Sequence, residues 1–332
     1  MQNQPLVSII TPGYNCGAMV HRLLDSILAQ TWQNIEFIFV NDGSTDNTAE
    51  VLESYRERFD ARGISMTVIY QENQGQAAAL GNGLPHFNGE FLCWCDSDDY
   101  LESDALESRA NILIQNPGCT VVAGQTNVVD CETLTTQRVI APSQTASHPN
   151  VLFMSILQDT NHAYYCCGAY MLRSEAFLNA NPERYIYPSR AGQNIQMLLP
   201  ILYLSSVYIL DKPVYNYVVL PNSHSHTNRT QKQQMERFRD LHTIRVETLK
   251  RMRIPVDLQE EYSRVSETAM YKVQYSLALQ YQNKDLAKAI KRILKSRHVY
   301  SLRDAINYWA SVIPVFGFVA KKFRNFCKSL QN

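Results

Sequence analysis

Several features that mark common protein classes are missing from this sequence. Its 31 Lys and Arg are balanced by 31 Asp and Glu, whereas a general nucleic-acid binder needs a strong basic excess. No run reaches the roughly 18–20 consecutive apolar residues that a membrane-spanning helix needs. The opening residues MQNQP are polar and uncharged, so we expect no secretory signal peptide. With 45% hydrophobic and 19% charged residues, the composition indicates a folded globular protein.

The cysteine and glycine patterns exclude further kinds of site. The eight cysteines are scattered, and neither Cys93-x-Cys95 nor Cys166-Cys167 has the spacing of a zinc site. We therefore expect reduced thiols in a cytoplasmic protein. Neither G-x-G-x-x-G after the first expected strand nor G-x-x-x-x-G-K-[ST] occurs, which disfavours nicotinamide enzymes and P-loop NTPases.

The most informative stretch joins an apolar run to a group of carboxylates. Residues 91–95 (FLCWC) are typical of a buried strand, and Asp96, Asp98 and Asp99 follow at once. Carboxylates this close repel one another, so a positive partner is expected. Oxygen ligands fit a hard divalent cation such as Mg²⁺ or Mn²⁺, which completes its shell with water and substrate phosphates. The alternative is that Asp98 or Asp99 caps a helix expected from about Glu102.

The chain before this stretch alternates between strands and helices. Apolar β-branched runs predict strands at 6–10, 35–40 and 66–70, and helical spacing predicts helices at 19–30, 48–59 and 77–84. This succession predicts an α/β fold with a mostly parallel, doubly wound sheet, in which ligands bind beyond the carboxyl ends of the strands. Four polar loops should then meet at one crevice, which favours the metal over the cap: Pro12–Asn15, Asp42–Asp46, Asn73–Gln76 and Asp96–Asp99.

The second half gives a coarser prediction. Residues 120–124 and 163–172 are strand-like, 126–147 form a loop or hairpin, and 206–213 with 214–218 form a closing strand pair. Helices are expected at 151–157 and from Arg173, and again at 237–253, 259–282 and 285–294. We therefore expect an α/β domain over residues 1–230 and a helical C-terminal region over 231–332.

The tail at 308–326 is apolar and aromatic and becomes basic at its end. Pro314 and Gly317 interrupt it, and it is too short to span a bilayer. Two interpretations remain open: a segment lying in the membrane interface, with Lys321 and Lys322 facing lipid phosphates, or a helix packed on the domain. The expected location is therefore cytoplasmic, with or without peripheral contact at the inner face of the membrane.

Three motifs together resemble the family-2 inverting glycosyltransferases of the GT-A fold. They are Pro12-x-Tyr14-Asn15, the run from Val40 to Asp46 (VNDGSTD) and Asp96-Ser97-Asp98-Asp99, in this order and at these strand ends. The resemblance covers about residues 5–105 and weakens towards 230. It implies a mixed, mostly parallel sheet flanked by helices, with a nucleotide-sugar donor half at 1–105 and an acceptor half at 106–230. It also implies sugar transfer from a nucleotide-sugar, UDP-linked by preference, to a hydroxyl acceptor.

The resemblance also assigns roles to individual residues. It implies that Pro12, Tyr14 and Asp42 hold the nucleotide base and ribose. Asp96 and Asp98 match the family's D-x-D motif, which binds ribose and a Mg²⁺ or Mn²⁺ bridging the diphosphate. Asn73 and Gly75 stand where the family approaches the donor, although a simple turn explains this pair equally well.

One segment departs from the family pattern. Gln193-Asn194 stands where the family carries a Glu-Asp pair whose Asp is the general base. Amides do not titrate and cannot accept the acceptor's proton. Three readings stay open: Asn194 orients the acceptor while Asp159, His162 or Glu183 takes the proton, the donor phosphate acts as base, or transferase activity has been lost.

The remaining expectations concern a late metal ligand, the acceptor and rival functions. His226, in the run NSHSHTNR, is a candidate ligand for the cation, and a simple polar loop is the alternative. The expected acceptor is a cell-surface polysaccharide or a lipid-linked glycan. A nucleotidyltransferase is a weaker hypothesis, because residues 11–17 contain no Lys or Arg. A non-catalytic nucleotide-sugar or glycan-binding protein is supported only by Gln193-Asn194.

Overall fold

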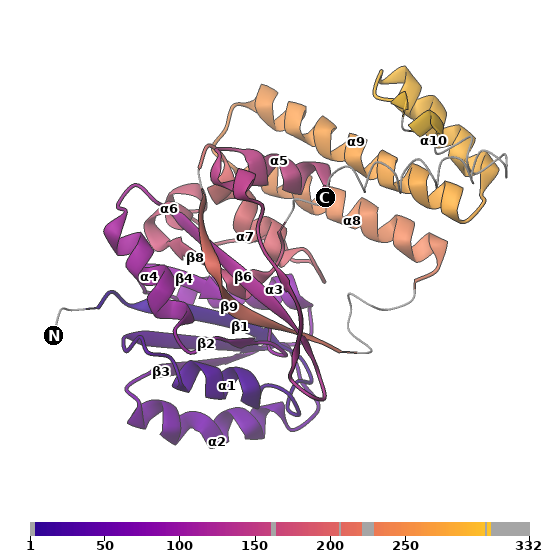
Figure 1. The fold of residues 1–332 in the computed structure, drawn as a ribbon. Helices are drawn as coiled ribbons and strands as arrows, with labels where there is room; N and C mark the ends of the chain where they lie inside the picture. Colours follow the sequence, from indigo (N-terminus) through magenta and orange to yellow (C-terminus); the bar gives the residue numbers. More distant parts are fainter. Residues whose placement is uncertain (1–3, 161–163, 206, 221–228, 303, 307–332) are drawn as a thin grey trace. The chain divides into compact units, whose positions relative to one another are not determined.

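The computed structural model describes residues 4–160, 164–205, 207–220, 229–302 and 304–306 (Figure 1). The chain forms two compact units. The first comprises Met1–Ile156, Thr160–Thr227 and Ile244–Gln259, and the second comprises Leu157–Asp159, Asn228–Thr243 and Glu260–Asn332. The tail at 308–326 and its expected membrane contact lie outside the described residues.

The first unit opens with the predicted alternation of strands and helices. Strands β1 (Val7–Gly13), β2 (Ile35–Asn41), β3 (Ser65–Tyr70) and β4 (Phe91–Trp94) are parallel, in the order β3-β2-β1-β4. Helices α1 (His21–Leu28), α2 (Thr48–Ala61) and α3 (Gln76–Gly83) connect them. Every residue of β1, β2 and β4 is buried, as expected for parallel strands covered on both faces.

The sheet continues beyond β4 with strands from the second half. Strand β8 (Tyr170–Arg173) lies antiparallel to β4, and β6 (Val121–Asp130) lies antiparallel to β8. Strand β9 (Val207–Val219) runs parallel to β6, and the short β5 (Tyr100–Leu101) and β7 (Thr136–Ile140) pair antiparallel with β9 and β6. The strands of the described residues therefore form one mixed sheet. A loop or a hairpin was predicted for residues 126–147, and the structure has the hairpin, formed by β6 and β7.

Two strand predictions for the second half are wrong. The expected pair at 206–213 and 214–218 is a single strand, β9. Pro213 lies opposite Gln125, between two register shifts in the pairing of β9 with β6, and such irregular places in a sheet are where proline is tolerated. Within 163–172 only Tyr170 onwards is strand, because Cys167–Ala169 forms a 3-10 turn, and residue 163 lies outside the described part.

Helices α4 (Ala105–Gln115), α5 (Val151–Gln158), α6 (Ser174–Ala180) and α7 (Gln193–Leu202) complete the main elements before β9. Helices α8 (Gln231–Arg251), α9 (Val256–Gln280) and α10 (Lys284–Ser296) follow. Two further 3-10 turns lie at Leu84–His86 and Gln144–Ser147. None of the helices in the described part is long and apolar enough to cross a membrane. The predicted domain boundary at 230 stays a prediction.

The core of the second unit is built by one apolar side of each helix. Its buried members come from α8, α9 and α10: Met235, Tyr275, Leu277, Ala278, Ala287, Ile290 and Leu294.

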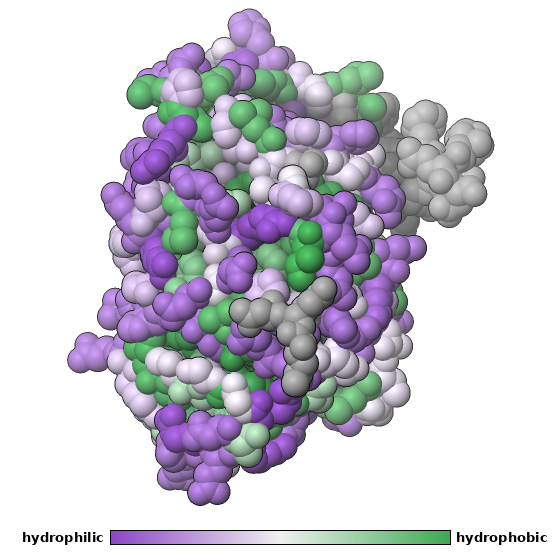
Figure 2. Space-filling view, turned by 90° about the vertical axis from the view of Figure 1, so that its left-hand side faces the viewer, coloured by the Kyte–Doolittle hydropathy of each residue, from purple (hydrophilic) through white to green (hydrophobic). Residues whose placement is uncertain are grey.

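On the face of the molecule in Figure 2, hydrophilic and hydrophobic residues are interspersed. Such mixing is ordinary, because more than half of a folded protein's accessible surface is apolar.

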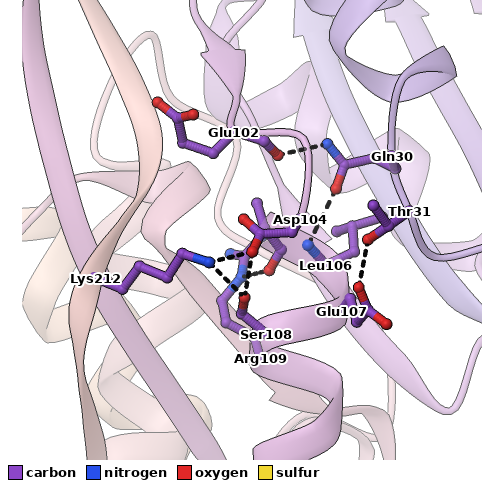
Figure 3. Close-up of polar contacts among 10 residues, drawn as sticks. Gln30, Thr31, Glu102, Asp104, Leu106, Glu107, Ser108, Arg109 and Lys212 are labelled. Atoms are coloured by element: carbon purple, nitrogen blue, oxygen red, sulfur yellow. Dashed lines mark hydrogen bonds and ion pairs between the residues drawn. The ribbon is translucent and has the colours of Figure 1, made fainter.

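The start of α4 is fixed by contacts from distant parts of the first unit (Figure 3). The side chain of Gln30 donates to the carbonyl of Glu102 at 2.7 Å and accepts from the backbone N–H of Leu106 at 3.1 Å. Asp104, the N-cap residue, forms an ion pair with Lys212. The helix therefore begins at Ala105, three residues later than the sequence predicts.

Candidate functional site

The carboxyl ends of β1 to β4 meet at one edge of the sheet. Gly13 pairs with Asn41, and Asn41 with Tyr70, so three strands end in register. The loops that follow are tied together. The N–H of Asn15 donates to Ser44 Oγ at 2.9 Å, and Asn15 Oδ1 accepts from the N–H of Thr45 at 2.8 Å. The loops after β1 and β2, two of the four predicted to share a crevice, are thus side by side.

The loop after β3 is held by Asp42. This buried carboxylate accepts hydrogen bonds from Gln71 Nε2 at 2.7 Å and from the backbone N–H groups of Gln74 and Gly75, both at 2.9 Å. Asp42 therefore positions the loop. A further donor, such as the N–H of a nucleotide base, has to share the carboxylate with these three. This structural task was not predicted from the sequence.

Gly75 is required where that loop meets the segment before α7. Its φ of +94° lies in the left-handed region, and a Cβ there would come within 2.5 Å of the Cα of Arg190. Arg190 Nη1 donates to Asn73 Oδ1 at 3.3 Å. The predicted donor residues Asn73 and Gly75 thus lie against a cationic side chain. Among the other predicted donor residues, Pro12 is buried in β1 and Tyr14 is 50% exposed beyond it.

Asp96, directly beyond β4, has a perturbed carboxyl group. Burial, followed by repulsion from Asp98, raises the pKa of Asp96 to about 7, and hydrogen bonds from Cys167 and Gln193 oppose the shift. Gln76 Nε2 also donates to Asp96 Oδ1 at 3.0 Å. The site therefore holds an aspartate whose negative charge is costly unless a cation accompanies it.

Asp99 has a different role from its neighbours. It is 1% exposed, and its carboxyl group accepts hydrogen bonds from the Tyr215 hydroxyl and, at 2.8 Å, from the N–H of Val218. Burial and then repulsion from Asp98 and Asp96 raise the pKa of Asp99. Because α4 begins at Ala105, the helix-cap interpretation of Asp98 and Asp99 is wrong. Asp99 joins the carboxylate loop to β9.

The contact between Tyr215 and Asp99 gives a first prediction. Tyr215→Phe leaves a buried carboxyl oxygen without its donor, so we expect the free energy of unfolding to fall by about 1–2 kcal/mol. Tyr208→Phe, on the exposed side of the same strand, should change it by less than about 0.5 kcal/mol. Urea denaturation measures both. Equal effects of the two variants would show that the hydroxyl does not anchor the loop.

Gln193 and Asn194 form the first residues of α7, after Gly192 at φ +80°. Asn194 Oδ1 accepts from Trp94 Nε1 at 2.7 Å, and its Nδ2 donates to the carbonyl of Tyr165 at 2.9 Å. Both polar atoms of the amide are therefore engaged, and the second contact requires a donor that a carboxylate lacks. Asn194 therefore ties the start of α7 to Trp94 and to the backbone at Tyr165, which we call its positioning role. Neither contact makes it a proton acceptor.

None of the other candidates for the general base is placed beside Asn194 by the described residues. Asp159, with φ +52°, belongs to the second unit, where its charge acts on Arg237. His162 and His226 lie outside the described residues. Glu183 precedes Arg184, whose guanidinium donates to the Phe87 carbonyl at 2.8 Å, before β4 begins. Glu183 itself is exposed, and the contact of its neighbour Arg184 is with the segment that precedes β4, whereas Asp96 follows that strand.

The carboxylates suit a hard cation of the kind predicted. Among the described residues no group of three or more His, Cys, Asp or Glu is arranged to hold a metal ion. One or two protein carboxylates are the usual contribution to a magnesium or manganese site completed by phosphates and water. Burial, followed by repulsion from Asp98, raises the pKa values of Asp96 and Asp99, so a cation would be needed to keep both carboxyl groups ionised.

Some contributors to the site carry no clear sequence signal. Gln76 lies in the predicted loop Asn73–Gln76 and Gln71 lies just before it, but their bonds to Asp42 and Asp96 were not predicted. Trp94 and Tyr215 lie in strands, where they resemble ordinary apolar residues. The available signal for the two glutamines was their position in or beside the predicted polar loop Asn73–Gln76. No local pattern indicates that Tyr215 meets Asp99.

Comparison with known sequences identifies similar proteins. A sequence model described as Glycosyl transferase family 2 matches residues 8–179, just over half of the chain. The Bacillus subtilis (strain 168) protein described as uncharacterized glycosyltransferase EpsJ is 30% identical over 230 residues, 66% of this chain and 62% of that protein. An uncharacterized glycosyltransferase of Haemophilus influenzae is 38% identical over 114 residues, 34% of this chain and 44% of that one. The chain spans less than two thirds of either relative.

Solved structures share the architecture. S. aureus TarS 1–349 in complex with UDP-GlcNAc superposes with a TM-score of 0.59 at 17% identity, covering 95% of this chain and 87% of that one. The mannosyltransferase PcManGT from Pyrobaculum calidifontis, in complex with GDP-Man and Mn²⁺, gives 0.56 at 17%, covering 98% and 84%. Identity this low shows the fold alone, and the predicted GT-A fold is confirmed.

Proposed function

Because this chain belongs to glycosyl transferase family 2, we propose that it is an inverting glycosyltransferase that uses a nucleotide-diphospho-sugar. The observation that carries the proposal is the group of carboxylates beyond β4, bordered by the loops that follow β1, β2 and β3. A diphosphate with a cation is the ligand whose charge and oxygen chemistry suit that group.

The donor end of the proposed site follows the loops. Asp42 and Tyr14 would bind the base, with Pro12 shaping the end of β1. UDP is the proposed nucleotide, as in the TarS complex with UDP-GlcNAc, and GDP is the alternative, as in the PcManGT complex with GDP-Man. Asn73 and Gly75 would line the approach of the diphosphate.

Asp96 and Asp98 would hold a Mn²⁺ or Mg²⁺ ion against the diphosphate, with His226 as a later ligand. When bound, such a cation offsets the negative charge that the leaving nucleoside diphosphate gains as the sugar bond breaks. The amide groups of Gln76 and Gln193 would keep Asp96 oriented. The Tyr215 and Val218 contacts would keep the loop in place through Asp99.

The acceptor would be a hydroxyl of a cell-surface polysaccharide or a lipid-linked glycan, met in the cytoplasm or at the inner face of the membrane. Direct displacement by that hydroxyl inverts the anomeric centre. Its proton has to leave by a group other than Asn194, whose amide is engaged by Trp94 and Tyr165. His162 and the donor phosphate are the proposed acceptors of the proton.

One observation favours a second function. The engaged amide of Asn194 would suit a protein that binds a nucleotide-sugar or glycan without turnover. Such a protein would retain the donor contacts and lack a proton acceptor.

Turnover separates the two functions. The protein is incubated with UDP- and GDP-sugars, Mn²⁺ and a glycan extract, and release of nucleoside diphosphate is measured. We expect acceptor-dependent release with at least one donor. Nucleotide binding without release from any donor would favour the binding protein, and absence of both would contradict the proposed function.

A further inference from the structure

Positive charge is concentrated at the end of the described chain. Residues 284–298 carry six Lys and Arg against one Asp. Since the whole chain has no formal net charge, this net +5 is balanced by −5 over the rest of the sequence. Such asymmetry favours an anionic partner for one region, although the protein as a whole is neutral.

The charge is ordered along helix α10. Lys284, Lys288, Lys291 and Lys295 follow one another at spacings of four, three and four residues, so they form one stripe on the helix surface. The stripe is about 16 Å long at 1.5 Å per residue. Three of its lysines are exposed and Lys291 is half-buried. We call these four side chains the lysine stripe.

The side of α10 next to the lysine stripe is packed against the core. Ala287, Ile290 and Leu294 are buried in the core of the second unit, which fixes the rotation of the helix. The lysine stripe therefore stays at the surface however the exposed side chains move. Arg297, outside the stripe, pairs with Glu267 at 2.6 Å and adds a further hold on the end of the helix.

The charges of the stripe are crowded. Lys291 and Lys295 both lie over the ring of Tyr300, at 5.5 and 5.8 Å from its centre. Burial and then the charge of Lys295 lower the pKa of Lys291. An anionic partner would relieve this repulsion.

Exposed apolar side chains follow α10 in the sequence. Leu302 is 78% exposed and Ile306 is 40% exposed. Leu302 follows two residues after Tyr300, the ring that Lys291 and Lys295 approach. Exposed aliphatic groups near lysines suit a bilayer interface, where acyl chains receive the apolar groups and lipid phosphates the cations. A surface for single-stranded nucleic acid would instead pair cations with exposed aromatic rings, and Tyr300, the ring under Lys291 and Lys295, is partly buried against the helical core.

We propose that the lysine stripe and Leu302 form a docking surface for a bilayer that contains anionic phospholipid. The lysines contact lipid phosphates, and Leu302 enters the interfacial layer. This proposal goes beyond the proposed sugar transfer and does not depend on it. Docking should weaken with added salt, because the stripe is solvent-exposed.

The full chain is tested by co-sedimentation with phosphatidylcholine vesicles and with vesicles in which one third of the lipid is phosphatidylglycerol. The stripe variant replaces four residues: Lys284→Gln, Lys288→Gln, Lys291→Gln and Lys295→Gln. A matched control removes the same charge at exposed positions elsewhere: Lys232→Gln, Lys250→Gln, Arg264→Gln and Lys272→Gln. A second probe of the surface is Leu302→Gln, which removes no charge.

We expect binding to the anionic vesicles only, weakened about 100-fold in the stripe variant and little changed in the control. Leu302→Gln should weaken it several-fold, which keeps the test valid if the stripe variant does not fold. Undiminished binding by the folded stripe variant, equal losses in stripe and control variants, or no loss with Leu302→Gln would each overturn the proposal. Competitors are then added to the vesicle-bound protein, and the concentration that releases half of it is measured for each. Release by duplex DNA at a lower concentration than by inositol phosphate or by additional vesicles would also overturn the proposal.

Discussion

Asp98→Ala is expected to remove the metal-dependent part of UDP binding. Asp98 is one of the two carboxylates proposed to hold the cation, and its charge acts on both Asp96 and Asp99. Removing a residue that hydrogen-bonds to a metal ligand already lowers metal affinity about 10–100-fold. Removing a ligand itself should therefore lower the affinity for Mn²⁺ at least about 100-fold. Calorimetric titration with UDP in the presence of Mn²⁺ measures the change.

A matched control separates this effect from a general loss of negative charge. Asp60 is exposed on α2, and Asp60→Ala removes one carboxylate away from the site. This variant should bind UDP like the unaltered protein. If Asp98→Ala also does so, Asp98 is not a ligand of the cation.

Asn194→Asp is expected to destabilise the protein without creating a catalytic base. The change puts a carboxylate oxygen opposite the Tyr165 carbonyl, where the amide now donates at 2.9 Å. It also adds negative charge near the group of aspartates. Loss of the hydrogen bond with a partly buried charge should lower the free energy of unfolding by about 2–3 kcal/mol. Chemical denaturation and turnover are measured on the same preparation.

Asn116→Asp is the matched control for this change. Asn116 Nδ2 also donates to a backbone carbonyl, that of Ile112 at 2.8 Å, but the residue is exposed. Its substitution should cost less than about 0.5 kcal/mol. A gain in turnover by Asn194→Asp, with no greater loss of stability than Asn116→Asp, would contradict the positioning role and identify this place as that of the base.

The parallel part of the fold could be predicted because its signals are local. Each strand from β1 to β4 is an apolar run ended by polar loop residues, and each helix between them has its own apolar spacing. The topology rule then places the loops at one edge, and the structure has them bonded to one another. Neither step needs knowledge of a distant contact.

The errors arise where distant contacts decide the structure. Pro213 is accommodated in β9 at a register shift opposite Gln125. The residues around Pro213 do not predict this shift. The start of α4 depends on Gln30, 72 residues before Glu102, whose carbonyl it binds. Local spacing alone therefore split one strand and placed one helix too early.

The site shows the same division. The sequence predicts that Gln193-Asn194 stands at a helix start, and the chemistry of amides shows that neither side chain can take a proton. It does not indicate that Trp94, 100 residues earlier, donates to Asn194. Asp99, similarly, is satisfied by Tyr215, 116 residues later, so its separation in role from Asp96 and Asp98 requires the structure.

Calorimetric titration of the unaltered protein with UDP, in Mn²⁺ and again after chelation, tests the central claim most directly. The claim is that the carboxylates beyond β4 form the diphosphate end of a nucleotide-sugar site. It predicts binding in Mn²⁺ that falls at least about tenfold on chelation. Binding of equal strength in both conditions, or no binding of UDP or GDP in either, would contradict it.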